Sequence, residues 1–110
     1  MALHKIKIHV TLSRRLGPRR GWNLHVTPNR QQARWKDEIE WECLAPRGSA
    51  PFLVYFGAGG PMTDESYSPG RPKGKVKFKP FFRPCIFKYW VVVCYQNEIK
   101  LLDPDLEIVP

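Results

Sequence analysis

The chain has 110 residues, of which 43% are hydrophobic and 13% aromatic, and it carries a formal net charge of +8. This length suits a single domain over residues 1–110, and the apolar content excludes a disordered chain. Eleven prolines and eight glycines argue against a helical bundle, because both residue types disrupt helix interiors.

Two half-buried strands are predicted near the start of the chain. Apolar side chains alternate with polar ones over residues 5–12 and again over residues 22–27, and a period of two is typical of strands with one buried face. Pro28 ends or bends the second strand, and residues 29–34 are polar with no clear pattern. The alternation of Lys and His with aliphatic residues at the N-terminus is unlike a signal peptide.

Two further strands are predicted over residues 38–43 and 52–56. In the first, which follows a turn at Lys36-Asp37, three glutamates alternate with Ile, Trp and Cys. A helix over residues 34–43 is the alternative, because Ala and Glu favour helix, but the alternation favours the strand. A loop at residues 44–51 leads to the second strand, which is continuously apolar and therefore predicted to be buried.

Residues 57–74 form the longest stretch with neither a strand nor a helix pattern. Eight of them are Gly or Pro, which are typical of turns and loops. A loop of this length in a compact domain is usually functional or mobile. Lys then alternates with Val and Phe over residues 75–79, which predicts another short strand.

The longest predicted strand spans residues 86–95. Both of its faces are apolar, so we expect it to be central in its sheet. A tight turn at Gln96-Asn97 joins it to a partner strand around residues 99–101, and a last strand lies around residues 106–108. About eight short strands predict an all-β fold, a single Greek-key β-sandwich of cupredoxin-like or immunoglobulin-like type.

The chain from Trp22 to Pro110 resembles the small cupredoxin-like β-sandwich proteins. The likeness is carried by five short segments that occur in the family's order. They are Val26-Thr27-Pro28, Lys36-Asp37 followed by Ile39 and Trp41, Phe52-Leu53-Val54-Tyr55-Phe56, Lys88-Tyr89-Trp90-Val91-Val92-Val93, and the closing strand Leu102-Asp103-Pro104-Asp105-Leu106-Glu107-Ile108-Val109.

This resemblance implies electron transfer by a copper ion, but the chain lacks the ligands. A blue-copper site needs two histidines, a cysteine and usually a weak methionine. Cys94 aligns with the thiolate of the family, yet no histidine follows it, and Phe52 stands after Pro51 where the family has its first histidine. We therefore expect no copper centre and no cofactor.

The cysteines and histidines leave a metal-binding or redox function as the alternative. Cys43, Cys85 and Cys94 are odd in number and lack zinc-site spacing, so free thiols in a reducing, cytoplasmic compartment are expected. If strands 5–12 and 22–27 pair with Leu12 beside Trp22, His9 lies opposite His25 and close enough to share a metal ion. Two ligands do not make a structural zinc site, so the alternative is two solvated side chains.

Two basic clusters are the candidate sites for an anionic partner. Four guanidinium groups surround a Gly-Pro turn, and four lysines follow one another at every second position, near aromatic residues that could stack on bases. The residues are Arg14, Arg15, Arg19 and Arg20, then Lys73, Lys75, Lys77 and Lys79, with Phe81, Phe82 or Tyr67 as the aromatic candidates.

Lysines also protect edge strands from aggregation, and the glutamates over residues 38–42 could pair with them. Residues 1–50 hold ten basic against four acidic side chains, a net +6, and residues 51–110 hold eight against six, a net +2. This imbalance favours anionic partners, although it also serves solubility.

No grouping of side chains predicts an enzyme. We therefore expect a non-enzymatic binding module for a protein or an anionic polymer such as nucleic acid. The longest apolar run, Tyr89–Tyr95, is too short to span a membrane. A homodimer that covers an apolar face is a further possibility.

Overall fold

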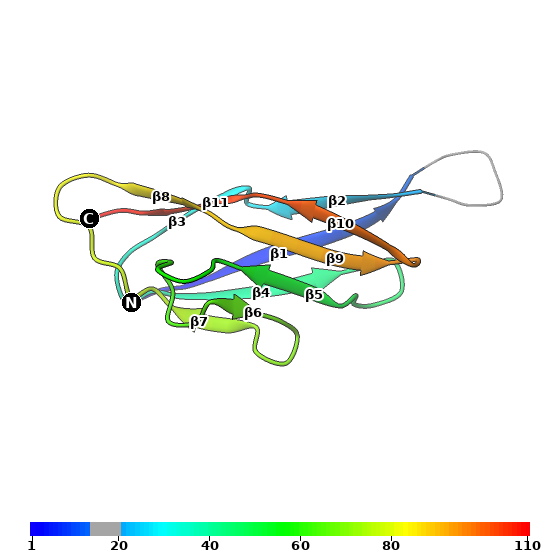
Figure 1. Ribbon diagram of the computed structural model, residues 1–110, viewed down its shortest axis with the longest axis horizontal. Coiled ribbons are helices and arrows are strands. Elements are labelled where there is room, and N and C mark those ends of the chain that lie inside the picture. Colours follow the sequence, from blue (N-terminus) through cyan, green and yellow to red (C-terminus); the bar gives the residue numbers. More distant parts are fainter. Residues whose placement is uncertain (14–20) are drawn as a thin grey trace.

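The computed structural model describes residues 1–13 and 21–110, and these contain strands and no helix (Figure 1). The all-β prediction is confirmed, and nothing in the described residues is a helix able to cross a membrane. Eleven strands, rather than about eight, form three sheets within this part of the chain. They are β1 (Leu3–Leu12), β2 (Trp22–Thr27), β3 (Arg30–Ala33), β4 (Glu38–Leu44), β5 (Phe52–Tyr55), β6 (Ser66–Tyr67), β7 (Lys73–Lys75), β8 (Cys85–Lys88), β9 (Trp90–Tyr95), β10 (Glu98–Leu102) and β11 (Asp105–Ile108).

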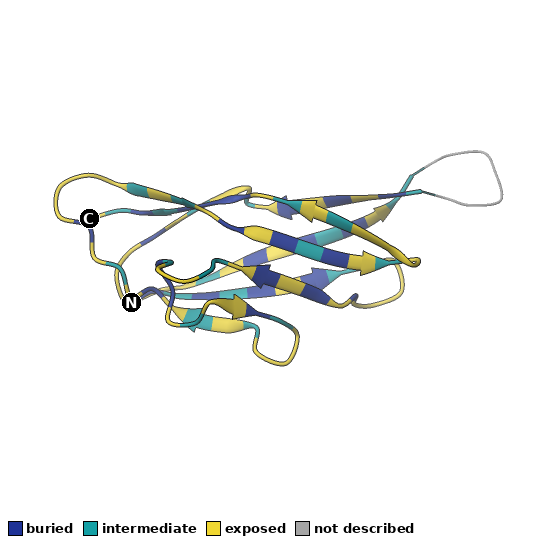
Figure 2. Ribbon diagram, in the orientation of Figure 1, coloured by how far each residue is buried: buried dark blue, intermediate teal, exposed yellow. Residues whose placement is uncertain are grey.

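The first sheet has the strand order β2-β1-β4-β7. β1 and β2 form an antiparallel pair, and its register sets Leu12 opposite Trp22 and therefore His9 opposite His25. β4 pairs in parallel with β1, so the strand prediction for this segment is correct and the helical alternative is wrong. Buried and more exposed residues alternate along these strands (Figure 2), because successive side chains of a strand lie on opposite faces of its sheet, and this is the physical origin of the period-two pattern.

The second sheet, β10-β9-β5-β6, packs its inner face against the first sheet, and the core lies between them. Trp41 of β4 stacks on Tyr67 of β6 with 4.9 Å between ring centroids and meets Tyr89 edge-on at 5.8 Å. Its indole N–H donates to the Tyr89 hydroxyl at 3.3 Å, so both buried polar groups have a partner. Burial raises the pKa of Tyr89 to about 12, so this hydroxyl is neutral at physiological pH.

The single strand predicted over residues 86–95 is wrong, because the chain changes sheets at Tyr89. The Tyr89 N–H donates to the carbonyl of Pro104 at 3.1 Å, at the point where the neighbouring chain also passes from β10 to β11. β9 is central between β10 and β5, as predicted, but only the side of Val91 and Val93 is buried. Trp90, on the opposite side, is 49% exposed.

The third sheet, β3-β11-β8, includes the segment after Pro28 for which no strand was predicted. β3 has one buried side chain, Ala33, so it lacks the apolar alternation that identifies strands. Asp105 of β11 lies opposite Arg30 of β3 and Lys88 of β8 and accepts a hydrogen bond from each at 3.0 Å. These bonds, from Lys88 and then Arg30, hold the pKa of Asp105 below its ordinary value.

Residues 57–74 are not one irregular loop. They contain β6 and the start of β7, and isolated bridges join Met62 to Val76 and Ser68 to Arg71. The strand predicted over residues 75–79 is wrong beyond its first residue: β7 ends at Lys75, and from Lys77 onwards the chain leaves β4 and hydrogen-bonds to the carbonyl of Pro61. The predicted turn at Gln96-Asn97 is confirmed, with a positive φ at both residues between β9 and β10.

Candidate functional site

The predicted basic residues are separated by the fold into groups with different surroundings. The arginine cluster Arg14, Arg15, Arg19 and Arg20 lies outside the described residues. Lys73 and Lys75 lie on β7, at the edge of the first sheet, opposite Glu40 and Glu38 respectively. The Lys73 ammonium is 3.4 Å from the Glu38 carboxylate, so the predicted pairing of lysines with this acidic strand is confirmed. These two lysines therefore face acidic side chains rather than an open anion site.

Lys77 and Lys79 lie beyond the end of β7, and Lys79 reaches an exposed tryptophan. Its ammonium is 4.6 Å from the ring centroid of Trp35, and the ammonium of Lys36 is 4.3 Å from the same centroid. Trp35 is 41% exposed. The electron-rich ring face attracts both cations, and an aromatic ring flanked by cations is the combination that binds nucleotide bases and phosphates together.

A tight turn and a pair of backbone hydrogen bonds position Trp35. The Asp37 N–H donates to the Arg34 carbonyl at 3.0 Å, and Lys36 closes the turn with a φ of 72°, in the left-handed region. The turn is joined to the chain that leaves β7, because the Lys36 N–H donates to the Val76 carbonyl at 3.0 Å and the Val76 N–H donates to the Asp37 carbonyl at 2.8 Å. This exchange brings the segment with Lys79 to the Trp35 ring.

Two adjacent phenylalanines project from the same segment. Phe81 and Phe82 are each 90% exposed, with 6.2 Å between their ring centroids. Phe78 anchors the segment by meeting Phe87 of β8 edge-on at 5.1 Å. The loop that carries them lies at the end of the molecule where both termini also lie (Figure 1). Tyr67, the third aromatic candidate, is buried, so that part of the prediction is wrong.

The cations at this end are not neutralised within the described part of the chain. Among residues 1–13 and 21–110, no carboxylate forms an ion pair with Lys36, Lys77, Lys79 or Arg83. We call this region the basic-aromatic end and define it by residues that bear either an unpaired cation or an exposed ring. They are Trp35, Lys36, Lys77, Lys79, Phe81, Phe82 and Arg83.

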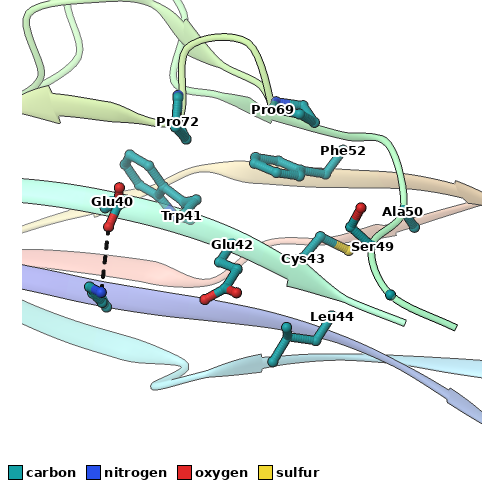
Figure 3. A pocket seen from close by; sticks show the side chains of 12 residues that line it. Glu40, Trp41, Glu42, Cys43, Leu44, Ser49, Ala50, Phe52, Pro69 and Pro72 are labelled. Carbon is teal, nitrogen blue, oxygen red and sulfur yellow. Dashed lines mark ion pairs between the residues drawn. The ribbon is translucent and has the colours of Figure 1, made fainter. Parts of the chain in front are cut away.

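A groove of about 640 Å³ elsewhere on the molecule has different chemistry (Figure 3). It follows the edge of β4 beyond Glu40, where β7 no longer pairs with β4, and it reaches Phe52 of the second sheet. Glu40 and Glu42 line this groove, and the ammonium of Lys5 lies 3.9 Å from the Glu40 carboxylate. The two carboxylates disfavour an anionic ligand in this groove, so the basic-aromatic end is the better candidate for one.

The thiols and histidines are not gathered into one site. Cys43 is buried, Cys85 is half-buried and Cys94 is exposed on β9, and all three are free. Burial raises the pKa of the Cys43 thiol, which makes it a poor nucleophile. No group of three His, Cys, Asp or Glu side chains suited to a metal ion occurs in the described ranges, and His9 and His25 remain a facing pair.

No protein-family model matches the chain, and no curated protein matches it. The sequence predicted Lys77, Lys79, Phe81 and Phe82 as candidates but not Trp35, although the predicted turn at Lys36-Asp37 directly follows it. A tryptophan directly before the predicted Lys36-Asp37 turn was the available signal.

Proposed function

We propose that this chain is a non-enzymatic binding module whose basic-aromatic end holds an anionic polymer, and that single-stranded nucleic acid is the polymer it fits best. The observation that carries the proposal is Trp35, half-exposed beneath the ammonium groups of Lys36 and Lys79. A base that stacks on this ring or on a nearby phenylalanine would bring its phosphate within reach of those ammonium groups. Stacking does not depend on base identity, so we expect little sequence preference.

An acidic protein would use the cations but gain little from three exposed rings. Base stacking contributes about 1–3 kcal/mol per base, whereas carboxylate side chains offer no comparable flat surface. Duplex DNA hides its bases within the stack, so it too leaves the rings unused. Single strands are therefore the partner that engages both components of the site.

Fluorescence anisotropy of a labelled oligo(dT) strand tests this proposal. We expect saturable binding at low salt. A plot of log K against the logarithm of the salt concentration should have a slope of about −0.7 for each phosphate contact. A duplex of the same length and poly-glutamate serve as competitors, and both should compete more weakly than unlabelled oligo(dT). Absence of binding at low salt, or equal competition by poly-glutamate, would contradict a nucleic-acid function.

Trp35→Ala is expected to weaken binding of the single strand about 10-fold, by loss of one stacking surface. Trp35→Phe keeps an aromatic face and should retain most of the affinity, which separates stacking from a change in the turn.

Lys79→Ala should lower the salt slope by about 0.7, whereas Lys7→Ala, which removes an equal charge from β1, should leave site-specific affinity nearly unchanged. Equal effects of the two lysine variants would indicate a nonspecific charge effect only.

The surroundings of the ionisable groups support a non-enzymatic role. Asp37 and Asp105, whose pKa values are lowered, are both engaged in bonds that join separate chain segments. Free thiols fit the cytoplasmic location that we propose for the module. For the fold we propose a Greek-key β-sandwich of cupredoxin-like or immunoglobulin-like type without a copper centre. The core between the two four-stranded sheets supports this assignment.

A weak metal site is the second candidate function. It is favoured by one observation, that His9 and His25 are direct cross-strand neighbours. Titration calorimetry with Cu²⁺ should then show one site that is lost in His25→Ala and retained in His4→Ala. Unchanged Cu²⁺ binding in His25→Ala would refute this assignment.

A further inference from the structure

The outer face of the second sheet is apolar across three adjacent strands. Val92 lies beside Leu53 on one side and Leu101 on the other, Tyr55 lies opposite Trp90, and Cys94 lies opposite Ile99. We call this surface the apolar face. Five of its side chains are 41–68% exposed: Leu53, Tyr55, Trp90, Ile99 and Leu101.

None of the residues that pair across β5, β9 and β10 on the apolar face carries a charge. Lys100, which lies between Ile99 and Leu101 on β10, points to the inner side, where its ammonium is 4.9 Å from the ring centroid of Trp22 and donates to the Trp22 carbonyl. The face differs from the first sheet, whose outer side carries the Lys73–Glu38 ion pair. Solvent therefore meets an uncharged, contiguous apolar surface here.

The extent of this surface approaches what a dimer needs. The five exposed side chains, together with Val92 and Cys94, present roughly 600 Å² of apolar area, near the upper limit of the largest patch on a typical monomer. A standard interface uses about 800 Å² from each partner, so this face supplies most of that area.

We propose that two copies of this chain pack face to face through the apolar face. Copies with a net charge of +8 repel each other at long range, and the apolar face adds no cation to that repulsion at the contact. Sheets pack about 10 Å apart when their side chains interdigitate. In such a dimer the two-fold axis lies between the two sheets and crosses β9 at Val92. Trp90 and Cys94 lie at equal distances on either side of Val92, so the large ring of Trp90 packs over the small Cys94 of the partner subunit. Large and small side chains then alternate, as the spacing between sheets requires.

Light scattering after gel filtration, over about 1–100 µM protein, tests the dimer. We expect the mass to rise from 12.8 kDa towards twice that value with concentration. Leu101→Lys should remain monomeric throughout, whereas Leu3→Lys, the same change at a site of similar exposure on β1, should dimerise like the unmodified protein. Circular dichroism verifies that both variants are folded.

Alkylation of the thiols by iodoacetamide gives an independent readout on the unmodified chain. Cys94 lies within the apolar face and should react about 10-fold more slowly at the highest protein concentration than at the lowest, while Cys85 on β8 serves as the internal reference. A monomer at every concentration with a constant Cys94 rate would overturn the proposal. A dimer that persists in Leu101→Lys would place the interface on another surface, which also overturns it.

Discussion

Asp37→Asn is expected to lower the free energy of unfolding by about 3 kcal/mol at neutral pH, because this carboxylate secures the N-terminus to the turn that carries Trp35. The Asp37 side chain is only 8% exposed. One oxygen accepts the Ala2 N–H at 3.0 Å, and the other accepts the Arg34 N–H at 3.0 Å and contacts the His4 Nε2 at 2.8 Å. An amide in this place would turn its NH₂ group towards one of the two backbone N–H donors in either orientation.

The loss should depend on pH in a defined direction. Burial raises the pKa of Asp37, but the hydrogen bonds from Ala2, His4 and Arg34 outweigh it, so the pKa lies below its ordinary value. A carboxylate with a lowered pKa stabilises the folded state above the pKa of the unfolded chain and loses that contribution as pH falls through the folded value. The difference between unmodified protein and Asp37→Asn should thus be complete at pH 7 and shrink below about pH 4.

Urea denaturation at a series of pH values measures this difference. Asp103→Asn is the matched control. Asp103 is 59% exposed and its carboxylate lies 4.0 Å from the Lys88 ammonium, which is a long ion pair in solvent, so the free energy of unfolding should change by no more than about 0.5 kcal/mol. A cost for Asp37→Asn that matches the control at pH 7, or that grows in acid, would contradict the role given to the carboxylate.

Gly74→Ala is expected to destabilise the fold by about 3 kcal/mol, because the added methyl group has no space. A β-carbon on Gly74 would overlap the Tyr67 hydroxyl and lie 2.5 Å from two carbons of its ring. Tyr67 cannot retreat easily, since it is buried and stacked on Trp41, and its hydroxyl accepts the Asp64 N–H at 3.2 Å. The methyl group must therefore separate β7 from β6 or displace the aromatic core.

Gly70→Ala provides the comparison for this variant. A β-carbon there meets nothing closer than the Ser68 hydroxyl at 4.0 Å, so we expect a change within about 0.5 kcal/mol. Guanidinium denaturation followed by tryptophan fluorescence measures both variants. Near-ultraviolet circular dichroism should change only in Gly74→Ala, where the Trp41–Tyr67 stack is disturbed. A stable Gly74→Ala protein with an unchanged aromatic spectrum would refute the steric argument.

Local alternation was sufficient to predict three strands of the first sheet, β1, β2 and β4. Over residues 5–12 and 22–27 the apolar positions repeat every second residue, and one buried face excludes a register shifted by a single residue. That reasoning placed His9 opposite His25, and it also identified the turn at Gln96-Asn97. The lysines and glutamates of neighbouring strands were likewise expected to pair, as Lys73 and Glu38 do.

The arrangement of the candidate site could not be obtained in this way. Trp35 and Lys79 are 44 positions apart, and they meet because the turn after β3 exchanges backbone hydrogen bonds with Val76. The change of sheet at Tyr89 was equally hidden, because an apolar run on both sides of a strand reads as a buried strand whether a second layer or solvent covers it.

The amino-acid sequence alone determined the all-β class, the buried face of the first strands and the basic character of the chain, because side-chain alternation and charge are properties of neighbouring residues. Tertiary structure alone decided which lysines face carboxylates, which aromatic rings remain in solvent and which side of β9 is left uncovered. These outcomes depend on contacts between residues far apart in the chain, whose formation is settled by the packing of whole sheets and not by any local pattern.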